Sequence, residues 1–291
     1  GKAEVWQDQL SDKLKALGKI LNISAIHREL QSHDIHHLIL CPHRDLHRLP
    51  LHIFFDGSSL DFSDDRDRPD PRLLEEAGDL NSHGYTCTYL PSLSFATIHT
   101  PSPIPNSPTL PSLLLVENPQ ITPKQASKPD TKGKKGLNPL PYAEAEAALI
   151  RQQFIEAQAP VVTIPREQAK RDAIATALAP PKSSDQPHQY FHFTGHGTYD
   201  SATPANSRLF LTNDETLTLL DIQKLGNLSH YELVCLAACE TAVTGTESIT
   251  AEYVGLVSAF LQAGVRTVVS TLWEVESLPS MILLVQFYRE M

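Results

Sequence analysis

The stretch Tyr190-Phe191-His192-Phe193-Thr194-Gly195-His196-Gly197 decides the fold of this chain, together with a second one, Leu233-Val234-Cys235-Leu236-Ala237-Ala238-Cys239. Each is a short apolar run, of the length of a β-strand, that ends on a polar and reactive residue. In a parallel sheet the carboxyl ends of the strands meet at one edge, where active residues gather. We therefore expect His196 and Cys239 to emerge at the same edge of a buried sheet.

The rest of the carboxyl-terminal half repeats this alternation of strands and helices. Apolar runs predict strands near 112–116, 161–164, 190–194, 232–238 and 266–271, and amphipathic segments predict helices near 143–157, 167–179, 250–263 and 278–290. Buried strands with crossover helices indicate an α/β fold with a mainly parallel central sheet and helices on both faces.

The amino-terminal part has a different pattern. Residues 4–31 predict an amphipathic helix that breaks around Ser32, and Leu38–Cys41 and Tyr85–Thr88 predict strands. The acidic stretch 61–70 and the proline-rich stretch 101–141, which contains a basic segment, predict loops. We expect a helical and β supporting subdomain at 1–110 and a catalytic domain at 111–291, with a mobile loop at about 118–139.

The two reactive residues indicate nucleophilic chemistry. An imidazole near a thiol takes its proton, and the thiolate is the nucleophile. We expect the glycines on either side of His196 to permit backbone angles that other residues avoid and to let a substrate chain approach closely. His192 and Cys235 lie inside their apolar runs and are interpreted as buried strand residues.

Composition excludes several classes of protein. A net charge of −10 argues against a nucleic-acid surface, which is normally basic. No apolar run reaches the roughly 18 residues that cross a bilayer, so no membrane partner is expected. The chain has four widely spaced cysteines, which favours a reduced cytoplasmic protein over a disulfide scaffold; they are Cys41, Cys87, Cys235 and Cys239.

Several further motifs give a resemblance to a known family. After His-Phe-Thr-Gly-His-Gly and Ala-Cys-Glu-Thr comes Gly255-Leu256-Val257-Ser258-Ala259-Phe260-Leu261-Gln262-Ala263-Gly264, and then a run that closes on Leu272-Trp273. Looser matches lie upstream, at 46–50, 89–93 and 140–146. The sequence resembles the CHAT family, caspase-like peptidases that are often fused to tetratricopeptide repeats. The resemblance implies a caspase-like α/β/α sandwich with an amino-terminal helical and β extension.

The resemblance also implies roles for particular residues. His196 and Cys239 match the catalytic dyad of caspases and separases, and the backbone N–H groups of Gly197 and Cys239 would hold the oxyanion. No cofactor is needed. The expected partner is a protein or peptide substrate, and an upstream repeat domain or regulatory protein is expected to control the activity in bacterial signalling or defence.

An acidic pocket would select a basic residue before the scissile bond, because a carboxylate pairs well with a guanidinium. Separases have an aspartate after Leu-Trp in the position of Glu274, so we expect cleavage after Arg, with Lys second. Glu276 and Asp200 are the other candidates for this pocket, although an acid after a strand is commonly solvated or caps a helix.

Three alternatives remain open. The domain could be a catalytically silent scaffold that binds partners, since Ala242-Val243-Thr244 stand where many relatives have glycine directly after Ala-Cys-Glu-Thr. It could be a thiol esterase or amidase that uses the same dyad. The histidines between His33 and His52 would allow a zinc site, but they include no helical His-x-x-x-His with a carboxylate base, so we expect no metal. Met291 falls inside a predicted helix, and relatives continue beyond it, so we expect a fragment.

Overall fold

The computed structural model describes twelve stretches of this chain. These are residues 12–33, 35–42, 46–47, 49–56, 84–95, 111–122, 137, 139–180, 188–198, 204–238, 253–271 and 275–291, with the side chains of 253 and 254 left out. The chain divides into two compact units, Gly1–Leu90 and Pro91–Met291, and each is described by itself. Because 96–110 lie outside the described residues, the expected boundary at 110 stays a prediction.

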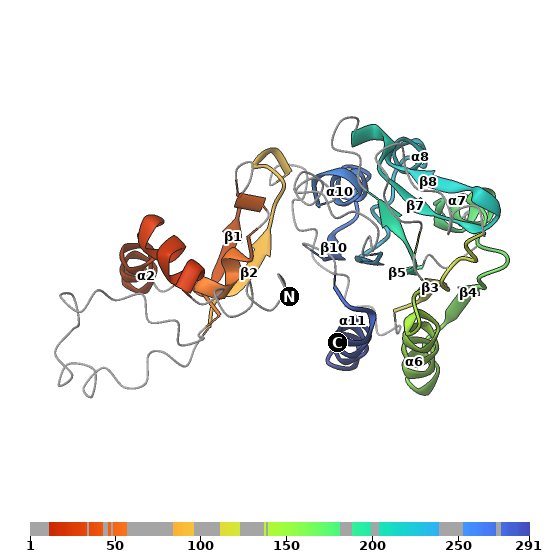
Figure 1. Cartoon of the computed structure of the whole chain (residues 1–291), viewed down its shortest axis with the longest axis horizontal. Coiled ribbons are helices and arrows are strands. Elements are labelled where there is room, and N and C mark those ends of the chain that lie inside the picture. Colours follow the sequence, from red (N-terminus) through yellow and green to blue (C-terminus); the bar gives the residue numbers. More distant parts are fainter. Residues whose placement is uncertain are drawn as a thin grey trace. The chain divides into compact units, whose positions relative to one another are not determined.

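The second unit is built on a five-stranded sheet in which every pair of neighbours is parallel (Figure 1). Its strands are β3 (Leu113–Val116), β4 (Val161–Ile164), β5 (Tyr190–Thr194), β9 (Leu233–Ala237) and β10 (Thr267–Ser270). Their spatial order is β10-β9-β5-β3-β4. Helices follow most strands, as parallel connections require. The predicted α/β fold with a mainly parallel central sheet is confirmed.

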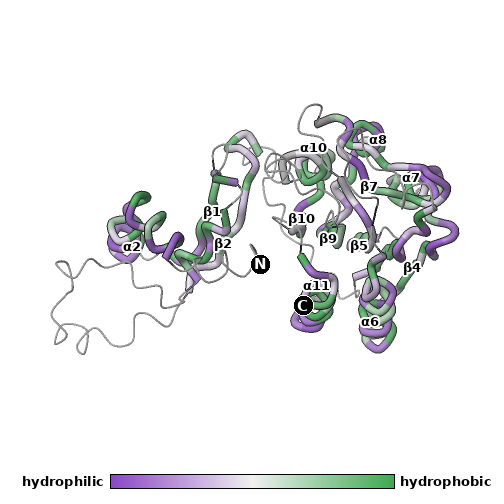
Figure 2. The backbone as a smooth tube through the Cα atoms, in the orientation of Figure 1, coloured by the Kyte–Doolittle hydropathy of each residue, from purple (hydrophilic) through white to green (hydrophobic). Residues whose placement is uncertain are grey.

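Helices cover both faces of this sheet. Alternate strand residues point to opposite sides, so Phe191 and Phe193 pack with α7 (Arg171–Leu178), α8 (Leu219–Lys224) and α10 (Ser258–Gln262). Leu113, Leu115 and Cys235 pack with α6 (Ala143–Glu156) and α11 (Ser277–Arg289) on the other side. In Figure 2 the central strands are mainly hydrophobic, whereas α6 and α11 have both hydrophobic and hydrophilic positions. This gives three layers, α/β/α.

A small antiparallel sheet follows the carboxyl end of β5. It consists of β6 (Gly197–Thr198), β7 (Arg208–Phe210) and β8 (Thr216–Thr218), and the turn between the last two has Asn213 and Asp214 at positive φ. Short 3₁₀ turns occupy Pro204–Asn206 and Thr212–Asp214. Helix α8 then begins at a capping box, in which the Thr218 hydroxyl accepts from the Asp221 N–H. None of these elements was predicted from the sequence.

The first unit has its own apolar core. Residues 12–20 are helical, α2 spans Ile23–Ser32, and β1 (His37–Leu40) pairs in parallel with β2 (Thr86–Tyr89). A 3₁₀ turn covers Leu51–Phe54. The core consists of Leu14, Ile23, Leu38, Phe54 and Phe55. The predicted helix and strands of the extension are present, but the predicted single helix is wrong: it breaks at Asn22, whose φ of 52° is one that asparagine tolerates.

One other prediction differs from the structure, and two are not tested by it. The helix expected at 250–263 begins as a π-helix, Tyr253–Val257, before α10 continues it. The acidic loop at 61–70 and most of the loop at 118–139 lie outside the described residues.

Candidate functional site

The register of β5 against β9 sets the relative positions of the two reactive segments. Thr194 is paired with Ala237, and these are the last residues of their strands. The pairing continues one step further, because the Gly195 N–H donates to the Ala237 carbonyl over 3.1 Å. His196 follows Thr194 by as many residues as Cys239 follows Ala237. Two neighbouring strands therefore bring His196 and Ala238 to the same edge of the sheet, and the position of Cys239 at that edge stays a prediction.

The chain packs closely against both glycines beside His196, so a larger residue would clash at either position. A Cβ atom at Gly197 would lie 2.9 Å from the carbonyl oxygen of Ala238, and one at Gly195 would lie 2.9 Å from Phe193 and Pro119. Neither glycine has a positive φ, so the expectation of unusual backbone angles is wrong. Gly197 instead lets the His196 loop touch the residue directly before Cys239.

Hydrogen bonds also fix the backbone of His196. The Phe210 N–H donates to the His196 carbonyl over 2.9 Å, and Gly197 is paired with Leu209. In an antiparallel ladder this makes Gly197 and Leu209 a non-hydrogen-bonded pair, so the Gly197 N–H points away from β7. The side chain of His196 is buried, with 2% of its surface exposed. Cys239, the predicted nucleophile, lies outside the described residues.

Of the three acids predicted to form a substrate pocket, the structure describes one. Glu274 and Asp200 lie outside the described residues. Glu276 is exposed and occupies the residue before α11, where its side chain makes no capping bond. Its neighbour Val275, however, lines a pocket at the carboxyl edge of the sheet. The structure thus brings the segment to the site, although it does not bring Glu276 into the pocket.

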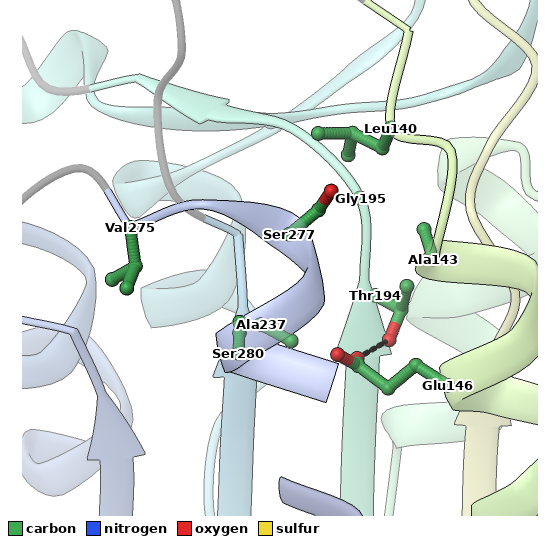
Figure 3. Close-up of a pocket in the computed structure, with 9 residues that line it drawn as sticks. All are labelled: Leu140, Ala143, Glu146, Thr194, Gly195, Ala237, Val275, Ser277 and Ser280. Atoms are coloured by element: carbon green, nitrogen blue, oxygen red, sulfur yellow. Dashed lines mark hydrogen bonds between the residues drawn. The ribbon is translucent and has the colours of Figure 1, made fainter. Parts of the chain in front are cut away.

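That pocket lies between the first turns of α6 and α11 and the ends of β5 and β9 (Figure 3). Leu140, Ala143 and Glu146 line it from the α6 side, Thr194, Gly195 and Ala237 from the strands, and Val275, Ser277 and Ser280 from the α11 side. Its volume is about 30 Å³, and one water needs about 10–15 Å³. It therefore has room for a small polar group.

A buried polar network lies beside the pocket, on the α6 and α11 face of the sheet. His192 is completely buried, and its Nε2 donates to Thr194 Oγ1 over 2.8 Å and to Glu146 Oε1 over 3.2 Å. The Thr194 hydroxyl donates in turn to Glu146 Oε1. On the other side of the ring, Nδ1 donates to the Tyr288 hydroxyl over 3.2 Å. The network ties α6, β5 and α11 together.

The network sets the protonation of its members. Burial by itself lowers the pKa of His192, but Cys235 and the Glu146 carboxylate offset this and raise the pKa to about 9. Burial raises the pKa of Tyr288 well above its ordinary value. At neutral pH, His192 is therefore an imidazolium that donates from both nitrogens, paired with Glu146.

His192 and Cys235 are confirmed as buried strand residues, directly opposite each other in the β5–β9 register. The residue that sequence reasoning missed is Glu146, which is 3% exposed and lines the pocket. An acid in the first turn of a helix is normally solvated and stabilised by the helix dipole. The signal that could have found it is its position on the α6 face that contains the buried residues Ala143, Ala147 and Ile150.

Other classes of site are not found in the described part of the chain. Its residues contain no cluster of three or more His, Cys, Asp or Glu side chains placed to hold a metal ion. The amino-terminal histidines make ordinary contacts: His37 bonds to Thr88, and His52 bonds to Tyr89. Cys41, Cys87 and Cys235 are free thiols. Among the helices described, none has the length and apolar character needed to cross a membrane.

Comparison with known proteins gives one family. The CHAT domain matches residues 11–291, nearly the whole chain. No curated protein matches it. Among solved structures, a flavodoxin of Streptococcus pneumonia TIGR4, described as a novel drug target, is similar over 62% of this chain and 94% of its own, with 10% sequence identity and a TM-score of 0.33. A likeness at that level has no bearing on fold or function.

Proposed function

Because the chain belongs to the CHAT domain family, which is related to caspase-like cysteine peptidases, we propose that it is a cysteine endopeptidase with Cys239 and His196 as its dyad. The observation that supports this most directly is the β5–β9 register, with Thr194 opposite Ala237. The contact of Gly197 with Ala238 is a second support, because these residues adjoin His196 and Cys239.

In the proposed mechanism, the Cys239 thiolate attacks the carbonyl carbon of the scissile bond, and His196 protonates the leaving amine. The N–H groups of Gly197 and Cys239 stabilise the oxyanion. The orientation of the Gly197 N–H, away from β7, is compatible with this role. Water then releases the acyl group from the sulfur, and no cofactor takes part.

The proposed substrates are proteins cleaved after a basic residue, arginine or lysine, with Glu274, Glu276 and Asp200 as the acids inferred from the sequence. We also propose that an upstream repeat domain or a partner protein controls the activity in a bacterial signalling or defence pathway. Full activity of the isolated chain would contradict this control.

The test is cleavage of a positional peptide library, scored by mass spectrometry. Wild type, Cys239→Ala and His196→Ala are compared with a matched control, Cys235→Ala, which removes the other thiol of the same strand. Without its regulator, the wild-type chain is expected to show basal cleavage after basic residues, as is the control, and the two dyad variants should lose about 10³-fold or more of that basal rate. Equal activity in Cys239→Ala and wild type would overturn the dyad.

A second candidate function is that of a silent scaffold which binds partners. The burial of His196 favours it, since a general base must reach the substrate's proton. Absence of cleavage by every variant, together with tight binding of a partner by both wild type and Cys239→Ala, would support the scaffold.

A further inference from the structure

The pocket between α6 and α11 is lined by residues that lie close in sequence to both members of the proposed dyad. Gly195 lines the pocket and directly precedes His196, while Ala237 lines it and lies two residues before Cys239. A peptide whose scissile carbonyl reaches Cys239 would therefore have a neighbouring side chain at the mouth of this pocket. This inference rests on the proposed function, because it needs a peptide at Cys239.

The chemistry of the pocket is dominated by one buried carboxylate. Figure 3 shows Glu146 extending from α6 toward the strand ends, where it meets Thr194. Both bonds to Glu146, from Thr194 and from His192, go to Oε1, and neither uses Oε2. His192 therefore balances the negative charge of Glu146 through Oε1, from within the sheet. A cation in the pocket would approach the same carboxylate from the opposite side.

The walls fit the rest of a basic side chain. Ala143 and Val275 offer apolar contact for a methylene stem, and the hydroxyls of Ser277 and Ser280 can accept hydrogen bonds from its head. A volume of about 30 Å³ holds a compact ammonium group more readily than a planar guanidinium. The pocket thus suits lysine better than arginine.

We propose that this pocket binds the basic side chain before the scissile bond, with lysine preferred, and that Glu146 is the acid that selects it. This assignment replaces Glu274, Glu276 and Asp200, the acids inferred from the sequence, by Glu146 in the first turn of α6; Val275 lines the same pocket.

The test measures binding apart from turnover. The fluorescent peptides differ only in the residue before the scissile bond, which is Lys, Arg, norleucine or Glu. They are titrated onto two proteins, the Cys239→Ala variant and the double variant Cys239→Ala with Glu146→Gln. The matched control is Glu144→Gln, which removes a carboxylate from the same turn of α6, where Glu144 is exposed and pairs with Arg166. Loss of a charge-assisted bond should lower the preference for Lys over norleucine by about 10- to 100-fold in Glu146→Gln, with the norleucine affinity unchanged. Glu144→Gln should keep the preference.

A second variant avoids disturbing the buried pair. Ser280→Lys adds a cation to the α11 wall, where the side chain is half-buried. It should abolish the preference for Lys and strengthen binding of the Glu peptide. Any of three results would overturn the inference: no preference for Lys before mutation, an equal loss of Lys and norleucine binding in Glu146→Gln, or a preference that survives both variants.

Turnover by the chain with Cys239 intact separates this inference from the proposed function. If that chain cleaves peptides with a preference that Glu146→Gln leaves unchanged, the pocket assignment fails and the peptidase stands. If Lys peptides bind in a Glu146-dependent way and no variant cleaves them, the pocket stands and the peptidase fails.

Discussion

Two histidine–cysteine pairs belong to β5 and β9 and to the segments that follow them, and the pairs differ in their position relative to the strand ends. The inner pair, His192 and Cys235, lies opposite in the register and is 0% and 1% exposed. The outer residues, His196 and Cys239, follow the ends of the same strands. The residue types are identical, so under the proposed function their position relative to the strand end separates the pair that stabilises the fold from the pair that carries out the chemistry.

The inner pair shows what a buried histidine requires. Its ring has partners on both nitrogens, from Tyr288, Thr194 and Glu146, and these come from three elements of the fold. An imidazolium that is fixed in this way cannot exchange its proton with a substrate. The backbone of the outer histidine is held by the bond from the Phe210 N–H to the His196 carbonyl.

The largest expected contrast is in the reactivity of the two thiols. Cys235 on the central sheet should react with iodoacetamide only when the chain opens, at least about 10³-fold more slowly than the exposed Cys41. Cys239 should react at least as fast as Cys41. Alkylation of each cysteine is followed by peptide mass spectrometry in wild type, and Cys239→Ala and Cys235→Ala confirm the assignment of the two peptides. A Cys235 that reacts as fast as Cys41 would end the distinction between the pairs.

Removal of His192 should cost the most stability. His192→Leu leaves the Glu146 carboxylate buried without its cation, and breaking such a pair costs about 3–5 kcal/mol of unfolding free energy. His188→Leu, at the amino end of the same strand, loses only its bond to Ser112 and should cost about 1 kcal/mol. Urea unfolding measures both. Equal costs would mean that the network adds nothing to ordinary burial.

The difference in unfolding free energy between wild type and a His192 variant should depend on pH through the protonation of His192. The pKa of His192 rises on folding from 6.5 to about 9, because Cys235 and Glu146 outweigh the effect of burial. The resulting stabilisation, at most about 3 kcal/mol, is complete below pH 6.5 and is lost as the pH rises through 9. Urea unfolding of wild type and His192→Gln between pH 6 and pH 10 measures it. The two proteins should converge at high pH; a constant difference would contradict the raised pKa.

The smallest expected effect is that of a substitution at Gly197, which directly follows His196. Gly197→Ala forces the Ala238 carbonyl to move and should cost about 1–3 kcal/mol. Gly226→Ala, at a φ of 82° with open space around it, should cost about 1 kcal/mol from backbone strain. Only Gly197→Ala should also change the alkylation rate of Cys239. An identical rate in both variants would show that the contact with Ala238 does not position the thiol.

The length and composition of each strand explain which strands could be predicted from the sequence. The strands at 161–164 and 190–194 coincide with their predicted bounds, because both are short runs rich in β-branched or aromatic residues. Strands β6 to β8 have two or three residues each and show no periodicity that a pattern could detect. The only local signal is the Asn213-Asp214 turn.

The site was predictable only in part, for a similar reason. His196 stands out because a strand ends at a reactive residue. Glu146 does not, because an acid in the first turn of a helix is ordinary, and only the packing of α6 against β5 and α11 buries it. Its position on the buried face of α6 is a local hint, but the contacts that bury it join residues far apart in the sequence.

The parallel register of β5 and β9 has a consequence for how such chains diverge. The segment that connects the two strands contains the small antiparallel sheet, α8 and the turn at Gly226, around which no atom lies within 4 Å of an added Cβ. Extra residues inserted at that turn would lengthen the connection while both strand ends keep their places. The number of residues between the histidine motif and the cysteine motif is therefore free to drift, and distant relatives are better aligned by strand ends than by spacing.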